Sequence, residues 1–136
     1  MDYAGDLTPR EAWELLDRDP RAVLVDVRSE PEWMFVGVPD VTGLGKRLVT
    51  VSWNLWPGGR NERFLDELGA AGVSGGDPVL FICRSGARSR SAAVAATQAG
   101  IGPSYNVAEG FEGDLDEEGH RGRYGWRAQG LPWRQS

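Results

Sequence analysis

One segment constrains the fold of this chain more than any other: an apolar run that leads directly into its single cysteine. The run covers residues 79–82 and ends at Cys83, and a loop rich in glycine, serine and arginine follows at residues 84–89. An alanine-rich stretch at residues 92–99 comes next. A continuous apolar run is typical of a buried parallel strand, so this order predicts a strand, a tight loop and a helix. Cys83 would then stand between the carboxyl end of the strand and the amino end of the helix.

The rest of the chain repeats this alternation. A capping box with proline at the first helical position, Thr8-Pro9-Arg10-Glu11, predicts a helix that begins near Pro9 and ends near Asp17. A second helix is expected after Asn61, ending near residue 69 or 72. Short apolar or β-branched runs predict further strands at residues 23–27, 48–53 and 104–107. Strands that alternate with helices imply an α/β fold, a parallel sheet with helices on both faces.

Length and composition fit a single domain. The 136 residues lie close to the common size of roughly 150 residues per domain, and 40% apolar content is ordinary for a globular protein. We expect a core at about residues 7–110 and an irregular extension at residues 111–136, anchored by Trp126 and Trp133. One cysteine excludes an internal disulfide, and neither a basic leader nor a membrane-length apolar stretch is found. These features favour a cytoplasmic protein with no membrane partner.

Charge is distributed unevenly around the cysteine. The formal net charge is −5, which argues against nucleic acid as a partner because such proteins usually carry a basic surface. Arg84, Arg88 and Arg90 nevertheless follow the cysteine, with no acid between Asp77 and Glu109. The local positive charge therefore indicates an anion site at the loop.

The loop suits a nucleophilic thiol. Helix amino ends and neighbouring cations favour the thiolate form of a cysteine, and loop amides can turn inward as a nest around an anion. Gly86 permits a positive φ, while Ser85 and Ser89 can donate hydroxyl hydrogen bonds. His120 lies among glycines and arginines, as in a surface turn, so a Cys–His dyad is not expected. One cysteine and one histidine are too few for a structural zinc site.

Several motifs together resemble a single-domain rhodanese of the thiosulfate sulfurtransferase family. They are Val25-Asp26-Val27-Arg28, Glu32-Trp33, the loop from Cys83 to Ser89, and the closing segments 110–114 and 125–133. The resemblance implies one rhodanese domain over residues 1–136, with a central parallel sheet of five strands. It also implies that Cys83 takes a sulfane sulfur from a small anionic donor such as thiosulfate, becomes a persulfide, and passes the sulfur to cyanide or a thiol.

The same resemblance assigns expected roles to the site residues. No metal or organic cofactor is implied. Asp26, Arg28 and Trp56 are possible supporting residues, and a buried ion pair between Asp26 and Arg28 is favoured over a catalytic role. The persulfide-binding loop would comprise Arg84, Ser85, Gly86, Ala87, Arg88 and Ser89.

Two segments depart from the family pattern, and two other functions stay open. Family members commonly carry a Gly-His-Ile-Pro-like segment where this chain has Gly37–Val41 without histidine, and residues 53–59 are unusually aromatic. A persulfide relay or binding module that acts only with a protein partner would fit the same residues. A cysteine phosphatase or arsenate reductase fits less well, because such loops place five residues between the cysteine and the arginine. Here four residues separate Cys83 from Arg88.

Overall fold

The protein is built around a parallel sheet of five strands in the order β1-β6-β5-β2-β4. The computed structural model describes residues 2–56, 58–73 and 75–135. In register, Val25 lies opposite Phe81 on the neighbouring strand, and Phe81 lies opposite Asn106 on the next. The expected α/β class and parallel five-stranded sheet are confirmed. The strands are β1 (Gly5–Leu7), β2 (Val23–Asp26), β4 (Val49–Thr50), β5 (Val79–Ile82) and β6 (Ser104–Val107).

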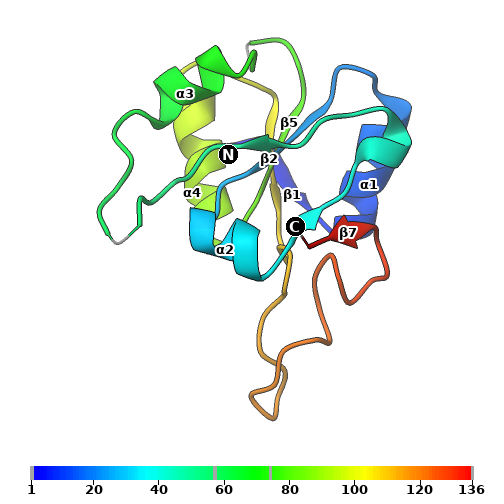
Figure 1. Ribbon diagram of the computed structural model, residues 1–136. Coiled ribbons are helices and arrows are strands. Elements are labelled where there is room, and N and C mark those ends of the chain that lie inside the picture. Colours follow the sequence, from blue (N-terminus) through cyan, green and yellow to red (C-terminus); the bar gives the residue numbers. More distant parts are fainter. Residues whose placement is uncertain (1, 57, 74, 136) are drawn as a thin grey trace.

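Helices cover both faces of this sheet (Figure 1). Alternate residues of β2 and β5 face opposite sides: Val25 and Phe81 belong to one core cluster, and Leu24 and Leu80 to the other. The first cluster lies under α3 and α4, and the second lies under α1. None of the helices in the described residues has the length and apolar character that a membrane crossing requires. The helices are α1 (Pro9–Arg18), α2 (Glu30–Phe35), α3 (Phe64–Ala70) and α4 (Ala87–Gln98), with a 3-10 turn η1 (Thr42–Leu44).

Helix α1 begins at the predicted capping box. The Thr8 hydroxyl accepts a hydrogen bond from the Glu11 amide at 3.1 Å, and the Glu11 carboxylate accepts one from the Thr8 amide at 2.9 Å. Leu15 and Leu16 are buried against the sheet. The helix ends at Arg18, one residue beyond the predicted end.

Helix α4 begins five residues earlier than the alanine-rich pattern predicts, at Ala87 instead of Ala92. Its first turn carries polar residues that face the cysteine rather than the core, and an apolar periodicity does not detect such a turn. Ala92, Ala93 and Ala96 are fully buried. Their small side chains bring α4 close to the sheet and place Arg88 and Ser89 beside Cys83.

Two elements are shorter than predicted. The strand expected at residues 48–53 is regular only at β4, although the Val51 and Trp53 amides still donate to the carbonyls of Asp26 and Val27. Asn61 caps a turn rather than the helix itself, since its side-chain oxygen accepts from the Arg63 amide at 3.0 Å and α3 begins at Phe64.

The end of the chain returns to the sheet region. Strand β7 (Trp133–Arg134) pairs antiparallel with β3 (Val38–Pro39), so the extension expected to be irregular contains one strand. Trp126 is fully buried, as expected of an anchor, and its indole donates to the Pro132 carbonyl at 2.7 Å. Trp133 is 42% exposed and its ring lies in a T-shaped arrangement with that of Phe111, 6.0 Å between centres, so it is a weaker anchor than expected.

Candidate functional site

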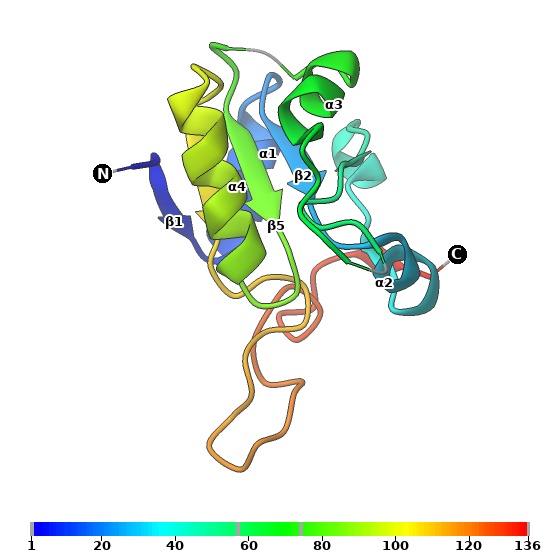
Figure 2. The same ribbon diagram turned by 90° about the vertical axis from the view of Figure 1, so that its left-hand side faces the viewer.

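Cys83 lies directly after β5, at the carboxyl ends of the parallel strands. In α/β sheets this is the end at which ligands bind. Figure 2 shows α2 and the C-terminal segment gathered at the same end of the sheet as the loop that follows β5. The thiol is almost fully covered, since Cys83 is only 1% exposed.

The loop curls around the sulfur atom. The Gly86 amide donates a hydrogen bond to Cys83 Sγ at 3.1 Å, and Ser89 Oγ lies 3.2 Å from the same sulfur. Gly86 has a φ of 113°, and a side chain there would collide with the Ala108 carbonyl oxygen. Glycine is therefore required at a position whose amide donates to the sulfur.

A second segment fixes the backbone of this loop from behind. The Phe111 amide donates to the Cys83 carbonyl at 2.8 Å, and the amides of Glu112 and Gly113 donate to the Arg84 carbonyl at 2.9 and 3.1 Å. Within the described residues, no hydrogen-bond acceptor is found for the amides of Ser85, Ala87 and Arg88. These amides stand at the amino end of α4, where backbone donors and the helix dipole favour an anion.

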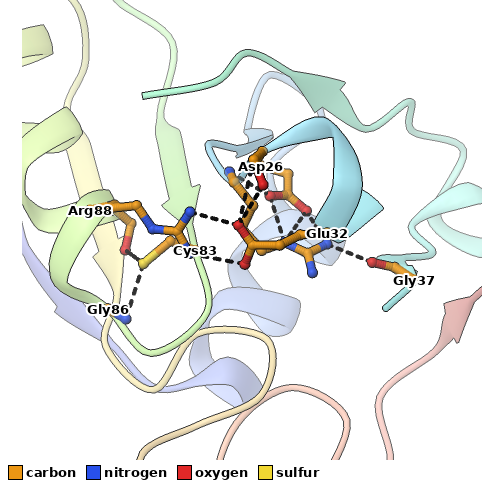
Figure 3. Close-up of polar contacts among 9 residues, drawn as sticks. Asp26, Glu32, Gly37, Cys83, Gly86 and Arg88 are labelled. Carbon is orange, nitrogen blue, oxygen red and sulfur yellow. Dashed lines mark hydrogen bonds and ion pairs between the residues drawn. The ribbon is translucent and has the colours of Figure 1, made fainter. Parts of the chain in front are cut away.

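An ion pair ties the loop to α2. Arg88 donates to the two carboxylate oxygens of Glu32 at 2.7 and 3.0 Å. Burial by itself raises the pKa of Glu32, but hydrogen bonds from Arg88 and Ser29 outweigh burial and lower it to about 2. The same hydrogen bond raises the pKa of Arg88, and the nearby Cys83 contributes to this rise. Figure 3 shows the Arg88 guanidinium group pointing past the sulfur toward Glu32.

Asp26 and Arg28 form the buried ion pair that the sequence favoured. Both side chains are fully buried, with Arg28 Nη2 2.6 Å from the carboxylate of Asp26. Arg28 Nη2 also donates to the Gly37 carbonyl at 2.6 Å, and the guanidinium lies 4.5 Å from the centre of the Phe111 ring. Arg28 Nε and Nη2 are used on Asp26 and Gly37, so the pair holds together the segments after β2 and after α2. Among the described residues, Arg28 Nη1 is buried without a hydrogen-bond partner.

A cleft of about 800 Å³ opens over the loop. Its wall includes the segment from Asn54 to Arg60, whose ends form an isolated antiparallel bridge. Trp56 lines the cleft and is 72% exposed, and Pro57 lies outside the described residues. Residues that contribute charge or an aromatic ring to the wall are Glu32, Trp56, Arg60, Arg84, Arg88 and Glu112.

The unpaired charges of this wall are positive. Arg88 is paired with Glu32, and Glu112 has Arg127 at 3.7 Å. Arg84 and Arg60 have no ion-pair partner among the described residues. Two free guanidinium groups at the cleft favour an anionic ligand.

Sequence reasoning did not identify three of these charged residues, Glu32, Arg60 and Glu112, as part of the site. Arg60 lies over the Trp53 ring, 3.5 Å from its centre, and the only sequence signal is its place after the aromatic segment and two glycines. Glu32 belonged to a recognised motif, but its contact with Arg88 spans 56 positions of the chain.

His120 is part of an exposed turn, as expected. Its side chain is 73% exposed and lies 3.9 Å from Glu118. The segment around residue 120 forms the tip of the loop that projects from the body of the protein in Figure 2. Among the described residues there is no group of three or more His, Cys, Asp or Glu side chains that could hold a metal ion.

Comparisons with known proteins identify relatives over nearly the whole chain. The family model described as STR4 middle domain matches residues 5–136. The crystal structure of Rv0390 from M. tuberculosis is 58% identical, with a TM-score of 0.90, and the match covers 98% of this chain and 99% of that one. The uncharacterized protein RC0915 of Rickettsia conorii is 35% identical over 124 residues, 90% of this chain and 91% of the relative.

Two further matches carry names that describe an activity. Thiosulfate sulfurtransferase GlpE of Actinobacillus pleuropneumoniae is 28% identical over 127 residues, 93% of this chain and 90% of that protein. The polysulfide-sulfur transferase homodimer from Wolinella succinogenes shares the fold, with a TM-score of 0.65 at 24% identity, over 99% of this chain and 80% of that one. The chain therefore belongs to the STR4 middle domain family and is a single-domain rhodanese-like protein with sulfurtransferases among its relatives.

Proposed function

We propose that the protein is a sulfurtransferase in which Cys83 carries one sulfur atom as a persulfide. The donor would be a small anion such as thiosulfate, and the acceptor would be cyanide or a thiol. The observation that supports this proposal most is the set of free amides at residues 85, 87 and 88, next to a sulfur that already accepts from Gly86. The name of the related GlpE protein points the same way.

The reaction divides into two transfers at one sulfur atom. In the first, the Cys83 thiolate attacks the outer sulfur of thiosulfate, the sulfur–sulfur bond of the donor breaks, and sulfite leaves with its electron pair. In the second, cyanide attacks the outer sulfur of the persulfide, thiocyanate forms, and the thiolate is restored. Neither transfer requires a metal or organic cofactor, because each is a nucleophilic displacement at the outer sulfur in which the bonding electron pair departs with the leaving group.

The charged side chains at the cleft and the backbone amides of the loop would have different roles. Arg84 and Arg60 would draw the donor into the cleft, while the amides of residues 84–88 would hold the outer sulfur of the persulfide. Ser85 and Ala87 leave room for this sulfur because their side chains are small. Trp56 would form the wall of the cleft, and the buried Asp26 and Arg28 would support the site without touching the substrate.

The loop is better suited to bind a sulfur atom than a phosphoryl group. Four residues separate Cys83 from Arg88, and the Arg88 side chain is held by Glu32. An arginine that clamps a phosphoryl group must offer its guanidinium to the substrate. Phosphatase or arsenate reductase chemistry is therefore not proposed for this site.

A specific observation favours a second candidate, a persulfide relay that receives or gives sulfur only when a protein partner is docked. Four large apolar side chains are exposed near the cleft: Met34 (59%), Phe35 (72%), Leu55 (50%) and Trp56 (72%). Exposed apolar groups that cluster together mark sites of protein contact. Glu30 and Pro31 join them around a smaller hollow of about 220 Å³.

Loading with thiosulfate tests the proposed function. We expect intact-protein mass spectrometry to show a gain of one sulfur atom, reversed by cyanide with release of thiocyanate and absent in Cys83→Ala. Arg84→Ala should raise the KM for thiosulfate about three- to tenfold, since one rim charge contributes on the order of 1 kcal/mol. The matched control is Arg18→Ala, an exposed arginine at the end of α1.

The outcomes separate the candidates. Loading by a persulfidated protein but not by thiosulfate would identify the relay, and failure with both would refute the sulfur-carrier role. Hydrolysis of an aryl phosphate that is lost in Cys83→Ser would contradict the argument from the loop. We place the reaction in a reducing compartment such as the cytoplasm, where a lone thiol stays reduced.

A further inference from the structure

A chain of hydrogen bonds runs from the sulfur of Cys83 to the edge strand β1. Ser89 Oγ lies 3.2 Å from Cys83 Sγ and 2.5 Å from Asn106 Oδ1. Asn106 Nδ2 donates to Asp6 Oδ1 at 3.0 Å, and the Tyr3 hydroxyl donates to the same oxygen at 2.8 Å. Ser89 and Asn106 are buried, with exposures of 0% and 2%, whereas Asp6 reaches solvent.

The donor and acceptor in each of these hydrogen bonds follow from the carboxylate of Asp6. An ionised carboxylate can only accept hydrogen bonds, so the Asn106 amide must point its NH₂ group at Asp6 and its oxygen at Ser89. A serine hydroxyl has one hydrogen, and two acceptors lie within its reach, Asn106 Oδ1 at 2.5 Å and Cys83 Sγ at 3.2 Å. We infer that the hydrogen goes to Asn106 Oδ1, because that contact is the shorter one. Toward Cys83 the serine oxygen therefore presents only lone pairs.

This direction favours the protonated form of the sulfur. A thiol can donate its hydrogen to Ser89 Oγ, whereas a thiolate has none to donate and would face the lone pairs of that oxygen. To donate a hydrogen bond to a thiolate, the Ser89 hydroxyl must turn to the sulfur, which leaves Asn106 Oδ1 buried without a donor. A buried acceptor without a donor is disfavoured.

Other groups near the sulfur act in the opposite sense. The Gly86 amide and the positive charge of Arg88 favour an anion, and Glu32 on α2 and Asp26 on β2 offset part of the Arg88 charge. At the end of this row of hydrogen bonds that is farthest from the sulfur, Arg90 lies close to Tyr3. The balance at the sulfur thus depends on whether Ser89 donates or accepts.

We propose that Asp6 and Asn106 are positioning residues that fix Ser89 as a hydrogen-bond acceptor toward Cys83, so that in the resting protein this contact favours the thiol over the thiolate. This inference rests on the proposed role of Cys83 as the sulfur carrier. For turnover the thiol proton leaves to solvent and the Ser89 hydroxyl turns to the sulfur. A resting thiol is protected, because oxidants and alkylating agents attack the thiolate.

Asp6→Asn tests the proposal with almost no change in shape. An amide at position 6 can donate to Asn106, whose own amide can then turn and donate to Ser89, leaving the Ser89 hydrogen free for the sulfur. We expect the ratio of thiolate to thiol at neutral pH to rise about tenfold, equivalent to about 1.4 kcal/mol. The readout is the ultraviolet absorbance of the thiolate, taken as the difference from the same variant with Cys83→Ser, and it needs no sulfur donor.

Three further variants make the outcome decisive. Tyr3→Phe removes the other donor to Asp6 without changing the direction of the chain, so the thiolate ratio should stay unchanged. Asn106→Ala removes the acceptor of Ser89 and should raise the ratio, which keeps the proposal testable if Asp6→Asn does not fold. In a Ser89→Ala background, Asp6→Asn should have no effect, because the coupling passes through the Ser89 hydroxyl.

Several results would overturn the inference. They are an unchanged or lower thiolate ratio in folded Asp6→Asn, an equal rise in Tyr3→Phe, and a rise that persists without the Ser89 hydroxyl. Failure of the proposed function is distinguishable from these results. A protein that shows the thiolate shift but accepts no sulfur from any donor keeps the hydrogen-bond chain and loses the sulfurtransferase role.

Discussion

Replacing Glu32 with glutamine tests the ion pair that joins α2 to the cysteine loop. The substitution keeps the shape of the side chain but removes the charge that pairs with Arg88. The pKa of Glu32 is lowered from its ordinary value of 4.5 to about 2 in the folded protein. At about 1.4 kcal/mol for each pH unit, this shift corresponds to about 3 kcal/mol before any correction for solvent.

Solvent reduces that figure. The side chains of Arg88 and Glu32 are 25% and 21% exposed, and they line an open cleft. Partly exposed ion pairs are screened by water and salt, so we expect the pair to contribute about 1–2 kcal/mol to the free energy of unfolding at neutral pH. Because the folded-state pKa is lowered, this contribution is present in full above about pH 4.5 and is lost as the pH falls toward about 2.

Urea unfolding at a series of pH values measures this dependence. The free energy of unfolding of the wild-type protein should exceed that of Glu32→Gln by about 1–2 kcal/mol at neutral pH. This difference should shrink steadily below about pH 4.5. Glu30→Gln is the matched control, an exposed carboxylate at the start of the same helix, and it should change stability by a few tenths of a kcal/mol at most. A difference for Glu32→Gln that is the same at every pH, or absent at neutral pH, would refute the reasoning.

Two other substitutions test the parts of the structure that support the site. Arg28→Met leaves the Asp26 carboxylate buried and unpaired, so the free energy of unfolding in urea should fall by about 3–5 kcal/mol. The double variant Asp26→Leu/Arg28→Met should recover most of that loss. A loss below about 1 kcal/mol in the single variant would contradict the argument. Gly86→Ala forces a side chain into a positive φ and against the Ala108 carbonyl, so it should lose stability on the order of 1–3 kcal/mol and lose sulfur loading at Cys83, measured by thermal unfolding and mass spectrometry. Gly43→Ala, with open space around it, should behave like wild type, and full sulfur loading in Gly86→Ala would show that the close approach of Gly86 to the sulfur is not needed.

The buried strands could be predicted closely because their signal is local. Strands β5 and β6 have the predicted bounds, and β2 ends one residue before the predicted end. Strands β1, β3 and β7 each have two or three residues, and their partners are far away in sequence: Gly5 pairs with Tyr105, and Val38 with Arg134. No local pattern specifies such pairings.

Helix α2 is marked in the sequence by a local signal, a capping box at its first turn. Ser29 and Glu32 form a capping box in the structure, with the Ser29 amide donating to the Glu32 carboxylate at 3.2 Å. The helix has six residues and none of them is buried, so an apolar periodicity could not reveal it. A search for capping pairs would have placed it.

The candidate site was predictable where its parts are contiguous. A loop that follows a strand and starts a helix necessarily curls near its own cysteine, so residues 83–89 could be chosen from the sequence. The contacts that orient the loop join distant positions: Arg88 with Glu32, Ser89 with Asn106, and the Cys83 carbonyl with the Phe111 amide. These contacts depend on the order of strands in the sheet, which the residue pattern alone does not reveal.

The hydrogen bonds from residues 111–113 to the carbonyls of Cys83 and Arg84 limit how the cysteine loop can be transplanted. A graft of residues 83–89 onto another strand–helix junction would carry every side chain of the motif and none of the donors that hold its backbone. The grafted loop would sample many conformations, and ordering it around a sulfur would cost conformational entropy at each transfer. A working transplant would need two separate pieces of chain, the heptapeptide and the segment after β6.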